Sequence, residues 1–289
     1  MMKDYVIITD SGCDIPPELL SDWGVTCIDL TFHFKDEDHE YTNRDYSTAQ
    51  FYGMMREGKV IQTSAANIDI FMDRFGKVLA EGKDIFYLGF SSGLSCTVNN
   101  ARIAVDELRQ SYPMNTVRVV DSLCASAGQG LLLYLAVKKK KEGGSLDEIA
   151  AYTEDTIKHL CHWFTVDDLV YLKRGGRIDP AAAFVATVLN IKPVLHMDDA
   201  GHLINVSKVR GRKSAIRALA DKYEELACDP ENGVFFISHG DCLQDARALD
   251  SMLFEKYGHH AEVIADIGPV IGAHSGPGTL ALFFVGQNR

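Results

Sequence analysis

Short apolar runs in the first half of the chain end in polar turns and lead into amphipathic segments. A run of four to six apolar residues predicts a buried strand, and apolar residues at a spacing near 3.6 predict a helix. The alternation repeats along the chain, and repeated β–turn–α units predict a parallel sheet with helices on both faces. Strands are predicted at 5–9, 25–34, 85–90 and 117–120, and helices from Pro16-Pro17-Glu18 and at 46–57, 68–81, 97–110 and 124–141.

The pattern changes after about residue 160. Asp198-Asp199-Ala200-Gly201 joins two strand-like runs and predicts a hairpin. Because 289 residues exceed one ordinary domain, we predict an α/β protein of two domains. Residues 1–160 form a Rossmann-like parallel domain, and residues 161–289 form an α+β domain with a mostly antiparallel sheet. Strands of the second half are expected at 169–172, 193–197, 203–209, 234–238, 261–267 and 279–285, and helices at 181–189, 212–228 and 242–257.

Composition excludes several classes of protein. A net charge of -11 argues against a nucleic-acid partner, which needs a basic face. The seven cysteines are dispersed without a C-x-x-C pair, which favours a reducing cytoplasm over a disulfide framework or a zinc site. No signal peptide or membrane-length apolar run is visible. His159 and His162 share a three-residue spacing, which we interpret as helix surface rather than a metal site, so no metal is expected.

The most informative segment is the loop after the strand at 85–90, Ser91-Ser-Gly-Leu-Ser-Cys-Thr97. A strand that ends in Ser and Gly and then begins a helix presents backbone N–H groups, which suit a carboxylate or a phosphate. Gly89-Phe-Ser-Ser-Gly93 also fits G-x-S-x-G, the nucleophile elbow of serine hydrolases. The loop therefore either attacks an ester or holds an acid.

The hydrolase hypothesis needs a serine, an acid and a histidine in that order along the chain. Ser91, Asp241 and His274 supply the order. Against it, the elbow serine normally stands directly between strand and helix, whereas Gly93-Leu94-Ser95-Cys96 intervene here, and no oxyanion loop of the His-Gly type precedes it. A third possibility, a phosphate or nucleotide binder, lacks a glycine-rich P-loop with a lysine.

Four further polar clusters stand out. Taken alone, Thr63-Ser64 resembles a small helix cap, and Asp121-Ser122 ends a strand. His274 lies at the centre of a Gly/Pro loop, 272–278, between two apolar strands, and such loops often carry function. Two basic segments, 173–177 and 208–213, are either solvated turns or a docking surface for an acidic or phosphorylated partner.

Together these motifs resemble the DegV family, the bacterial fatty-acid-binding proteins that serve as the B subunit of fatty acid kinase. The resemblance spans essentially the whole chain. It rests on ordered motifs: Thr9-Asp-Ser-Gly-Cys-Asp14, Thr63-Ser64, the 91–97 loop, Val120-Asp121-Ser122, Leu172-Lys-Arg-Gly-Gly-Arg-Ile178, Ile191-Lys-Pro193, 208–213 and 268–278.

The resemblance implies a non-enzymatic carrier with no cofactor, whose tunnel between the two domains holds one long-chain fatty acid. Thr63 and Ser95 would hydrogen-bond the carboxylate, and a protonated His274 would complete the head-group site. Ser64, Ser91 and Ser92 would surround it.

The resemblance also implies partners. A kinase subunit would convert the bound acid to an acyl-phosphate, and transient contact with a membrane surface would allow lipid exchange. The expected kinase-docking residues are basic: Lys173, Arg174, Arg177, Arg210 and Arg212.

Three positions depart from the family pattern. Cys96 replaces the usual glycine, so the loop is expected to adopt φ > 0 there less easily. Ala65-Ala66-Asn67 stands where Gln-Pro-Ser is frequent, and Ala273 and Ser275 flank His274 where Thr is common. Chain length and saturation of the ligand depend on tunnel shape, which the sequence does not define.

Overall fold

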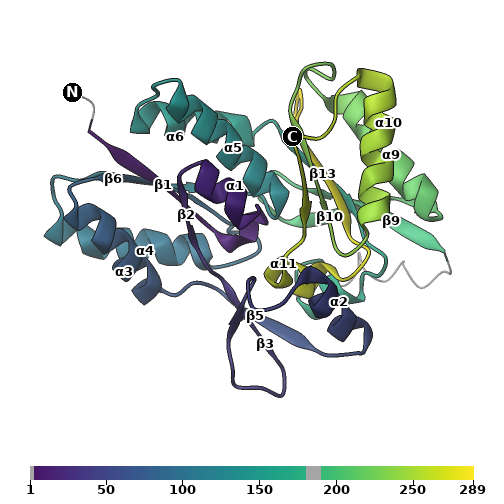
Figure 1. Cartoon of the computed structure of the whole chain (residues 1–289), viewed down its shortest axis with the longest axis horizontal. Coiled ribbons are helices and arrows are strands. Elements are labelled where there is room, and N and C mark those ends of the chain that lie inside the picture. Colours follow the sequence, from purple (N-terminus) through teal and green to yellow (C-terminus); the bar gives the residue numbers. More distant parts are fainter. Residues whose placement is uncertain (1–2, 180–189) are drawn as a thin grey trace.

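A four-stranded parallel sheet forms the first half of the protein. The computed structural model describes residues 3–179 and 190–289. The strand order is β2-β1-β6-β7, and all three pairings are parallel, as predicted (Figure 1). The strands are β1 (Tyr5–Asp10), β2 (Val25–Ile28), β6 (Asp84–Gly89) and β7 (Val117–Asp121).

Helices cover both faces of this sheet because its strands alternate buried side chains between them. On β1, Ile7 packs toward one face, and the next residue, Ile8, packs toward the other. A short 3-10 turn, η1 (Ser11–Cys13), and helix α1 (Pro17–Asp22) follow β1. One face is covered by α5 (Ala127–Lys141) and α6 (Leu146–Ile157), and the other by α3 (Ile68–Ala80) and α4 (Thr97–Ser111) (Figure 1).

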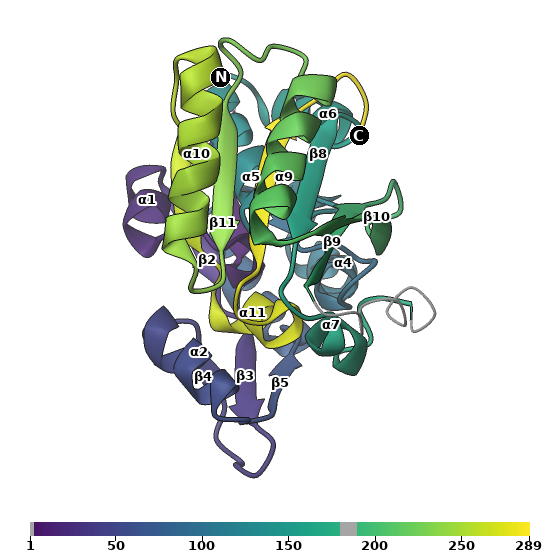
Figure 2. The same cartoon turned by 90° about the vertical axis from the view of Figure 1, so that its right-hand side faces the viewer.

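The second half contains a six-stranded sheet in the order β10-β9-β8-β13-β11-β12. Every pairing is antiparallel except β11–β12, so the predicted fold class is confirmed. Helices α9 (Arg212–Leu226) and α10 (Leu243–Tyr257) pack on one face (Figure 2). The strands are β8 (Leu160–Thr165), β9 (Ile191–Met197), β10 (Leu203–Arg210), β11 (Phe235–His239), β12 (Val263–Asp266) and β13 (Leu280–Val285).

The two sheets fall on either side of residue 160, where the sequence places a domain boundary. Helix α5 lies between them, because its buried residues join one hydrophobic core with strands of both sheets. At Gly128 an added Cβ would lie 2.8 Å from Phe283 Cδ1 of β13, so the close approach requires glycine. The division into domains 1–160 and 161–289 stays a prediction.

A third, three-stranded sheet was not predicted. It has the order β4-β3-β5, and helix α2 (Thr48–Arg56) lies beside it (Figure 2). The single strand expected at 25–34 is wrong: it breaks at Asp29-Leu30, and its second part pairs with the strand that carries Thr63. Thr63-Ser64 is therefore strand rather than a cap. The strands are β3 (Thr31–Phe34), β4 (Tyr41–Thr42) and β5 (Ile61–Ser64).

Three other expectations are corrected. The strand at 169–172 is instead helix α7 (Val170–Arg174), and the loop around His274 is largely helix α11 (Pro269–Ser275). Proline in the first turn of α11 and Gly276 with φ 81° after it are ordinary helix boundaries. His162 lies on strand β8 and is buried, so it is not helix surface. The helix predicted at 181–189 lies outside the described residues.

The buried carboxylate of Asp10 joins β1, β6 and α5 at the carboxyl edge of the parallel sheet. It accepts hydrogen bonds from the Tyr87 hydroxyl (2.7 Å), the Phe90 N–H (2.9 Å) and the Gly12 N–H (3.0 Å). Gln129 Nε2 of α5 donates to it at 3.3 Å. Burial raises the pKa of Asp10, and these donors oppose that shift. The Phe90 contact sets where the 91–97 loop begins.

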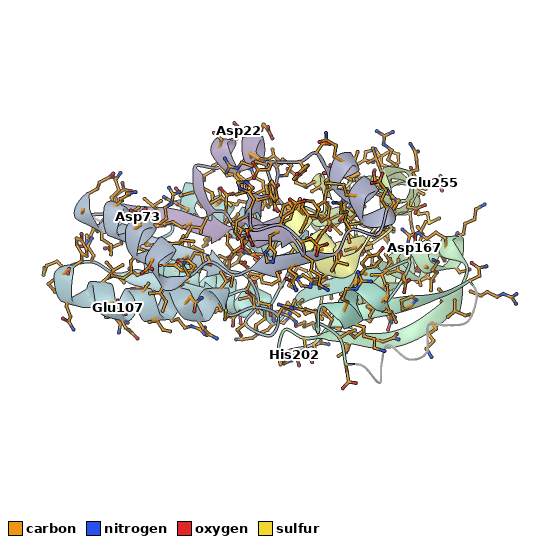
Figure 3. The ribbon with its side chains drawn as sticks, turned by 90° about the horizontal axis from the view of Figure 1, so that it is seen from below. Asp22, Asp73, Glu107, Asp167, His202 and Glu255 are labelled. Atoms are coloured by element: carbon orange, nitrogen blue, oxygen red, sulfur yellow. The ribbon has the colours of Figure 1, made fainter. Side chains whose placement is uncertain are left out.

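Acidic side chains lie on the outer margins of the molecule. Asp22, Asp73, Glu107 and Glu255 project from four different helices (Figure 3). In the described part of the chain, no helix is both long and apolar enough to cross a bilayer. Nor do residues 3–179 and 190–289 contain a cluster of three or more His, Cys, Asp or Glu that could hold a metal ion.

Replacing Asp10 with alanine is predicted to destabilise the fold strongly. The change leaves several buried donors without an acceptor, which costs on the order of 3 kcal/mol or more. Chemical denaturation measures the free energy of unfolding. The exposed Asp106 is the control, and Asp106→Ala is expected to change that free energy by less than about 0.5 kcal/mol. Equal effects of the two substitutions would contradict the role of Asp10.

Candidate functional site

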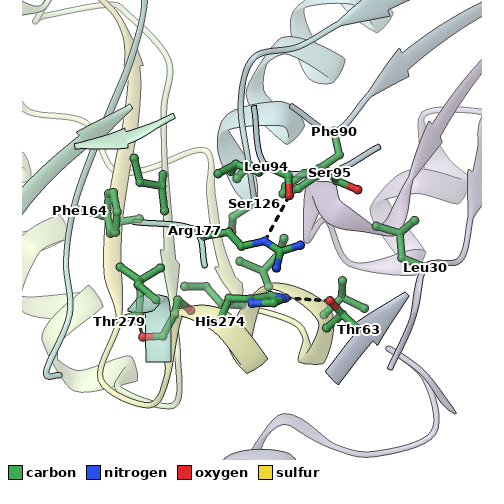
Figure 4. Close-up of a pocket in the computed structure, with 18 of the residues that line it drawn as sticks. Leu30, Thr63, Phe90, Leu94, Ser95, Ser126, Phe164, Arg177, His274 and Thr279 are labelled. Carbon is green, nitrogen blue, oxygen red and sulfur yellow. Dashed lines mark hydrogen bonds between the residues drawn. The ribbon is translucent and has the colours of Figure 1, made fainter. Parts of the chain in front are cut away.

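A cavity of about 260 Å³ lies where the three sheets meet. Its wall is mostly apolar, with a few convergent polar groups, as is typical of small-molecule sites. Figure 4 shows the polar groups, which come from separate elements. The lining residues are Leu30, Thr63, Ser64, Ala65, Phe90, Leu94, Ser95, Cys96, Ala125, Ser126, His162, Phe164, Leu172, Arg177, Leu203, Ile267, Val270, Ile271, His274, Ser275, Thr279 and Ala281.

Thr63 and His274 meet at one end of this cavity although they are 211 residues apart in sequence. Strand β5 presents Thr63, which pairs with Phe32 of β3, and the last turn of α11 presents His274. Thr63 Oγ1 and His274 Nε2 share a hydrogen bond of 2.7 Å (Figure 4). Both groups can donate to an anion that replaces this mutual bond.

Ser95 enters the cavity from the loop between β6 and α4. Its Oγ lies 2.9 Å from Thr97 Oγ1 and accepts a hydrogen bond from the Thr97 N–H at 3.2 Å. The neighbouring Cys96 has φ −79° and ψ 0°, so the loop does not need the positive φ that glycine favours. The expected difficulty with φ > 0 at Cys96 therefore does not arise, and Cys96 lines the cavity.

Arg177 also lines the cavity, which the sequence did not predict. Gly176 has φ 68°, and the chain turns there so that Arg177 reaches back and donates from Nε to the Leu94 carbonyl at 3.2 Å (Figure 4). A side chain at Gly175 would overlap Nδ1 of His274. The two glycines of the Lys-Arg-Gly-Gly-Arg motif therefore permit one close contact and one turn.

His274 is neutral in this cavity, contrary to the expected protonated imidazole. Burial, together with the positive charge of Arg177, lowers its pKa to about 4 from the ordinary value of 6.5. Burial lowers the pKa of Arg177 as well, but a guanidinium stays charged in proteins. The positive charge of the site therefore belongs to Arg177, while His274 offers a neutral hydrogen bond.

Of the six residues predicted to hold a carboxylate, four line the cavity: Thr63, Ser64, Ser95 and His274. Ser64 also donates to Glu40 at 3.1 Å. Ser91 and Ser92 are not among the lining residues. Ser91 is fully buried and donates to the Gly201 carbonyl at 2.9 Å, and the Ser92 N–H donates to Asp121 at 3.1 Å. These two serines position the loop.

The geometry does not support the hydrolase hypothesis. Ser91 bonds to Gly201 of the β9–β10 turn, while His274 bonds to Thr63. Asp241 forms an ion pair with Arg56 at 2.5 Å. The three residues of the supposed triad therefore have three different partners, whereas a triad needs hydrogen bonds from serine to histidine and from histidine to acid.

The five residues predicted to meet a kinase separate into three groups. Lys173 and Arg174 on α7 and Arg210 at the end of β10 are exposed. Arg212 is half-buried and forms ion pairs with Asp245 at 2.8 Å and Asp167 at 3.7 Å. Arg177 lies in the cavity wall. Lys173 and Arg174 lie close to the cavity, because Leu172 of the same helix α7 contributes to its lining.

These features define an apolar cavity with a cluster of polar groups where the three sheets meet. Residues 4–287 match the model of the DegV family COG1307, described as an uncharacterised protein family. A DegV domain-containing protein of Clostridium perfringens is 42% identical, with 100% of this chain and 99% of the relative covered. The chain belongs to the DegV family.

Solved DegV structures share the fold. A DegV lipid-binding protein of Thermotoga maritima matches with a TM-score of 0.85 at 30% identity, over 99% of both chains. A fatty-acid-binding DegV protein of Thermus thermophilus matches with a TM-score of 0.86 at 28% identity, over 99% of this chain and 100% of its own. DegV of Bacillus subtilis, a fatty-acid-binding protein, matches with a TM-score of 0.85 at 27% identity, again over 99% and 100%.

The titration of His274 tests the electrostatics of the site. In the ligand-free protein, NMR of the imidazole should show it neutral until the pH approaches about 4. Removing the neighbouring charge with Arg177→Gln should raise the pKa of His274, because the protonated ring then meets less repulsion. Lys173→Gln removes an equal charge outside the cavity wall and should leave the titration unchanged. A wild-type midpoint near 6.5 would contradict the assignment.

Proposed function

We propose that this protein binds one long-chain fatty acid in the cavity and presents its carboxyl group to a fatty acid kinase for acyl-phosphate formation. The single observation that carries the proposal is the junction of an apolar cavity with Thr63, Ser95, His274 and Arg177 at one end. The fatty acids and lipid bound by the DegV relatives of Thermus, Bacillus and Thermotoga support it.

The apolar wall supplies the affinity. Burying an acyl chain gains roughly 0.8 kcal/mol per methylene, so a long chain gains on the order of 10 kcal/mol before ordering costs are subtracted. Leu30, Phe90, Leu94 and Phe164 are among the side chains that would contact it. The lining comes from both halves of the chain, which agrees with a tunnel between the two predicted domains.

The polar end offsets the cost of burying a carboxylate. An isolated charge in an apolar site is strongly unfavourable unless it is paired and hydrogen-bonded. Arg177 would supply the opposite charge, and the Thr63 hydroxyl, the Ser95 hydroxyl and a neutral His274 would donate hydrogen bonds. Such a site would bind an acid through charge and hydrogen bonds alone. A carrier needs no activated nucleophile.

The double substitution Thr63→Ala and Ser95→Ala is predicted to abolish lipid retention. Each lost hydrogen bond to a charged group is worth about 1.5–3 kcal/mol, so affinity should fall by roughly 100-fold or more. Native mass spectrometry of the purified protein measures the bound lipid, and thermal unfolding checks the fold. Ser92→Ala, on the same loop but outside the cavity wall, is the control. Undiminished lipid in the double variant would refute the head-group assignment.

The presentation step requires a face that the kinase can approach. Lys173, Arg174 and Arg210 are exposed cations on an acidic protein, and they suit the negative charge of a phosphate donor or an acidic partner. Arg212 is excluded from this face because Asp245 and Asp167 already neutralise it. Transient contact with a membrane surface would then allow the lipid to exchange.

Charge reversal tests this face. The triple variant Lys173→Glu, Arg174→Glu and Arg210→Glu should slow acyl-phosphate formation by a kinase subunit more than tenfold, because attraction becomes repulsion. Its lipid content should stay normal. Lys138 and Lys141 on α5 and Arg247 on α10 are exposed cations on other helices, and reversing these three is the matched control. Equal rates for the two triple variants would place the docking face elsewhere.

A further inference from the structure

His162 is an unexplained polar group in the wall of the cavity. It lies on β8, two residues before Phe164 on the same strand, so both side chains point to the same face of the six-stranded sheet. Figure 4 shows Phe164 on the opposite side of the cavity from Thr63. His162 therefore belongs to the part of the wall that would contact the acyl chain rather than the carboxylate.

The imidazole of His162 is buried, and one of its nitrogens lacks a hydrogen-bond partner in the described chain. Its exposed fraction is 4%, and its Nδ1 has no hydrogen-bond partner among the residues that the structure describes. Its neighbours are aromatic: the ring centroid of Phe283 is 4.6 Å away and that of Phe164 is 5.7 Å away. Burial and the charge of Arg289 lower its pKa well below the ordinary value, so the ring is neutral.

A purely apolar ligand leaves this group unsatisfied. Buried polar side chains in proteins are nearly always hydrogen-bonded, and an unpaired one is costly. An alkyl chain packed against the ring would exclude water and offer no partner. A neutral imidazole has one donor and one acceptor, and a half-turn of the ring exchanges its nitrogen and carbon positions, so either role can be directed at the ligand.

We propose that the fatty acid carried by this protein bears a hydroxyl group along its chain and that His162 hydrogen-bonds that hydroxyl. This inference rests on the proposed function and narrows its substrate class to hydroxy fatty acids. The lining residue Ser275 also has an Oγ without a partner in the described chain, but a hydroxyl can rotate toward nearby carbonyls. The imidazole of His162 is held by the strand and its aromatic neighbours.

Competition binding to the lipid-extracted protein tests the inference. Octadecanoic acid is compared with a series of hydroxyoctadecanoic acids whose hydroxyl lies at different chain positions. At one position or a few adjacent ones, the wild-type protein should bind the hydroxy acid about tenfold more tightly than the unsubstituted acid. The series locates the carbon that faces His162.

Three variants separate a hydrogen bond from a change of shape. His162→Phe keeps an aromatic ring of similar size and should reverse the preference, because the ligand hydroxyl then has no partner. His162→Gln keeps a donor and an acceptor and should retain part of the preference. Leu94→Val changes the apolar wall on the 91–97 loop rather than on β8, and it should keep the ratio of affinities while weakening both acids.

The outcomes are distinct. Equal affinity of the wild-type protein for every acid in the series overturns the inference, as does an unchanged preference in a folded His162→Phe variant. If the His162→Phe variant does not fold, His162→Gln decides: a preference weaker than that of Leu94→Val supports the inference, and a preference as strong as that of Leu94→Val overturns it. If neither kind of acid binds, the proposed function itself is wrong, and this inference falls with it.

Discussion

The burial of helix α5 between two sheets is the constraint on which the rest of the structure depends. A helix that packs on both sides has no polar face, and this explains the apolar and small residues that run through its first eleven positions. Gly128 admits Phe283 of the mixed sheet, while Gln129 on the next position bonds to Thr9 and Asp10 of the parallel sheet. One helix therefore sets the spacing of both sheets.

The polar end of the cavity follows from that spacing. Thr63, Ser95, Arg177 and His274 come from the small sheet, the loop after β6, the turn after α7 and the end of α11. None of these elements alone carries all four polar groups, so the site exists only when the sheets are packed. Arg177 carries the positive charge of the site, and Thr63, Ser95 and His274 are its neutral donors. Burial, together with the charge of Arg177, lowers the pKa of His274, so Arg177 supplies the charge and His274 supplies a neutral hydrogen bond.

Much of this architecture could be predicted from periodicity, because strands β1, β6 and β7 and helices α3 and α4 obey their expected patterns. The errors fall where local patterns are short. The break in 25–34 depends on which sheet each part joins, and a four-residue run carries no such information. Glycines and prolines around His274 suggest a loop, but Pro269 begins and Gly276 ends the seven-residue helix α11.

The sequence predicts only those residues of the site that belong to recognisable family motifs. Thr63, Ser95 and His274 were reached through the family resemblance, whereas Arg177 was assigned to the surface because it stands in a basic run. A run of charges says nothing about which member turns inward. That is decided by Gly176, whose positive φ reverses the chain, and by the missing side chain at Gly175, which lets His274 approach.

The G-x-S-x-G match shows how one local sequence can serve two structures. In a hydrolase elbow the central serine is exposed on a strained turn. In this protein Ser91 is buried, and Gly93 packs so closely on the β9–β10 turn that a Cβ would lie 2.8 Å from the Ala200 carbonyl oxygen. The glycine and serine therefore hold the loop against the mixed sheet. The residue left to face the cavity is Ser95, four positions on, whose hydroxyl shares a hydrogen bond with Thr97 and can donate to a bound acid.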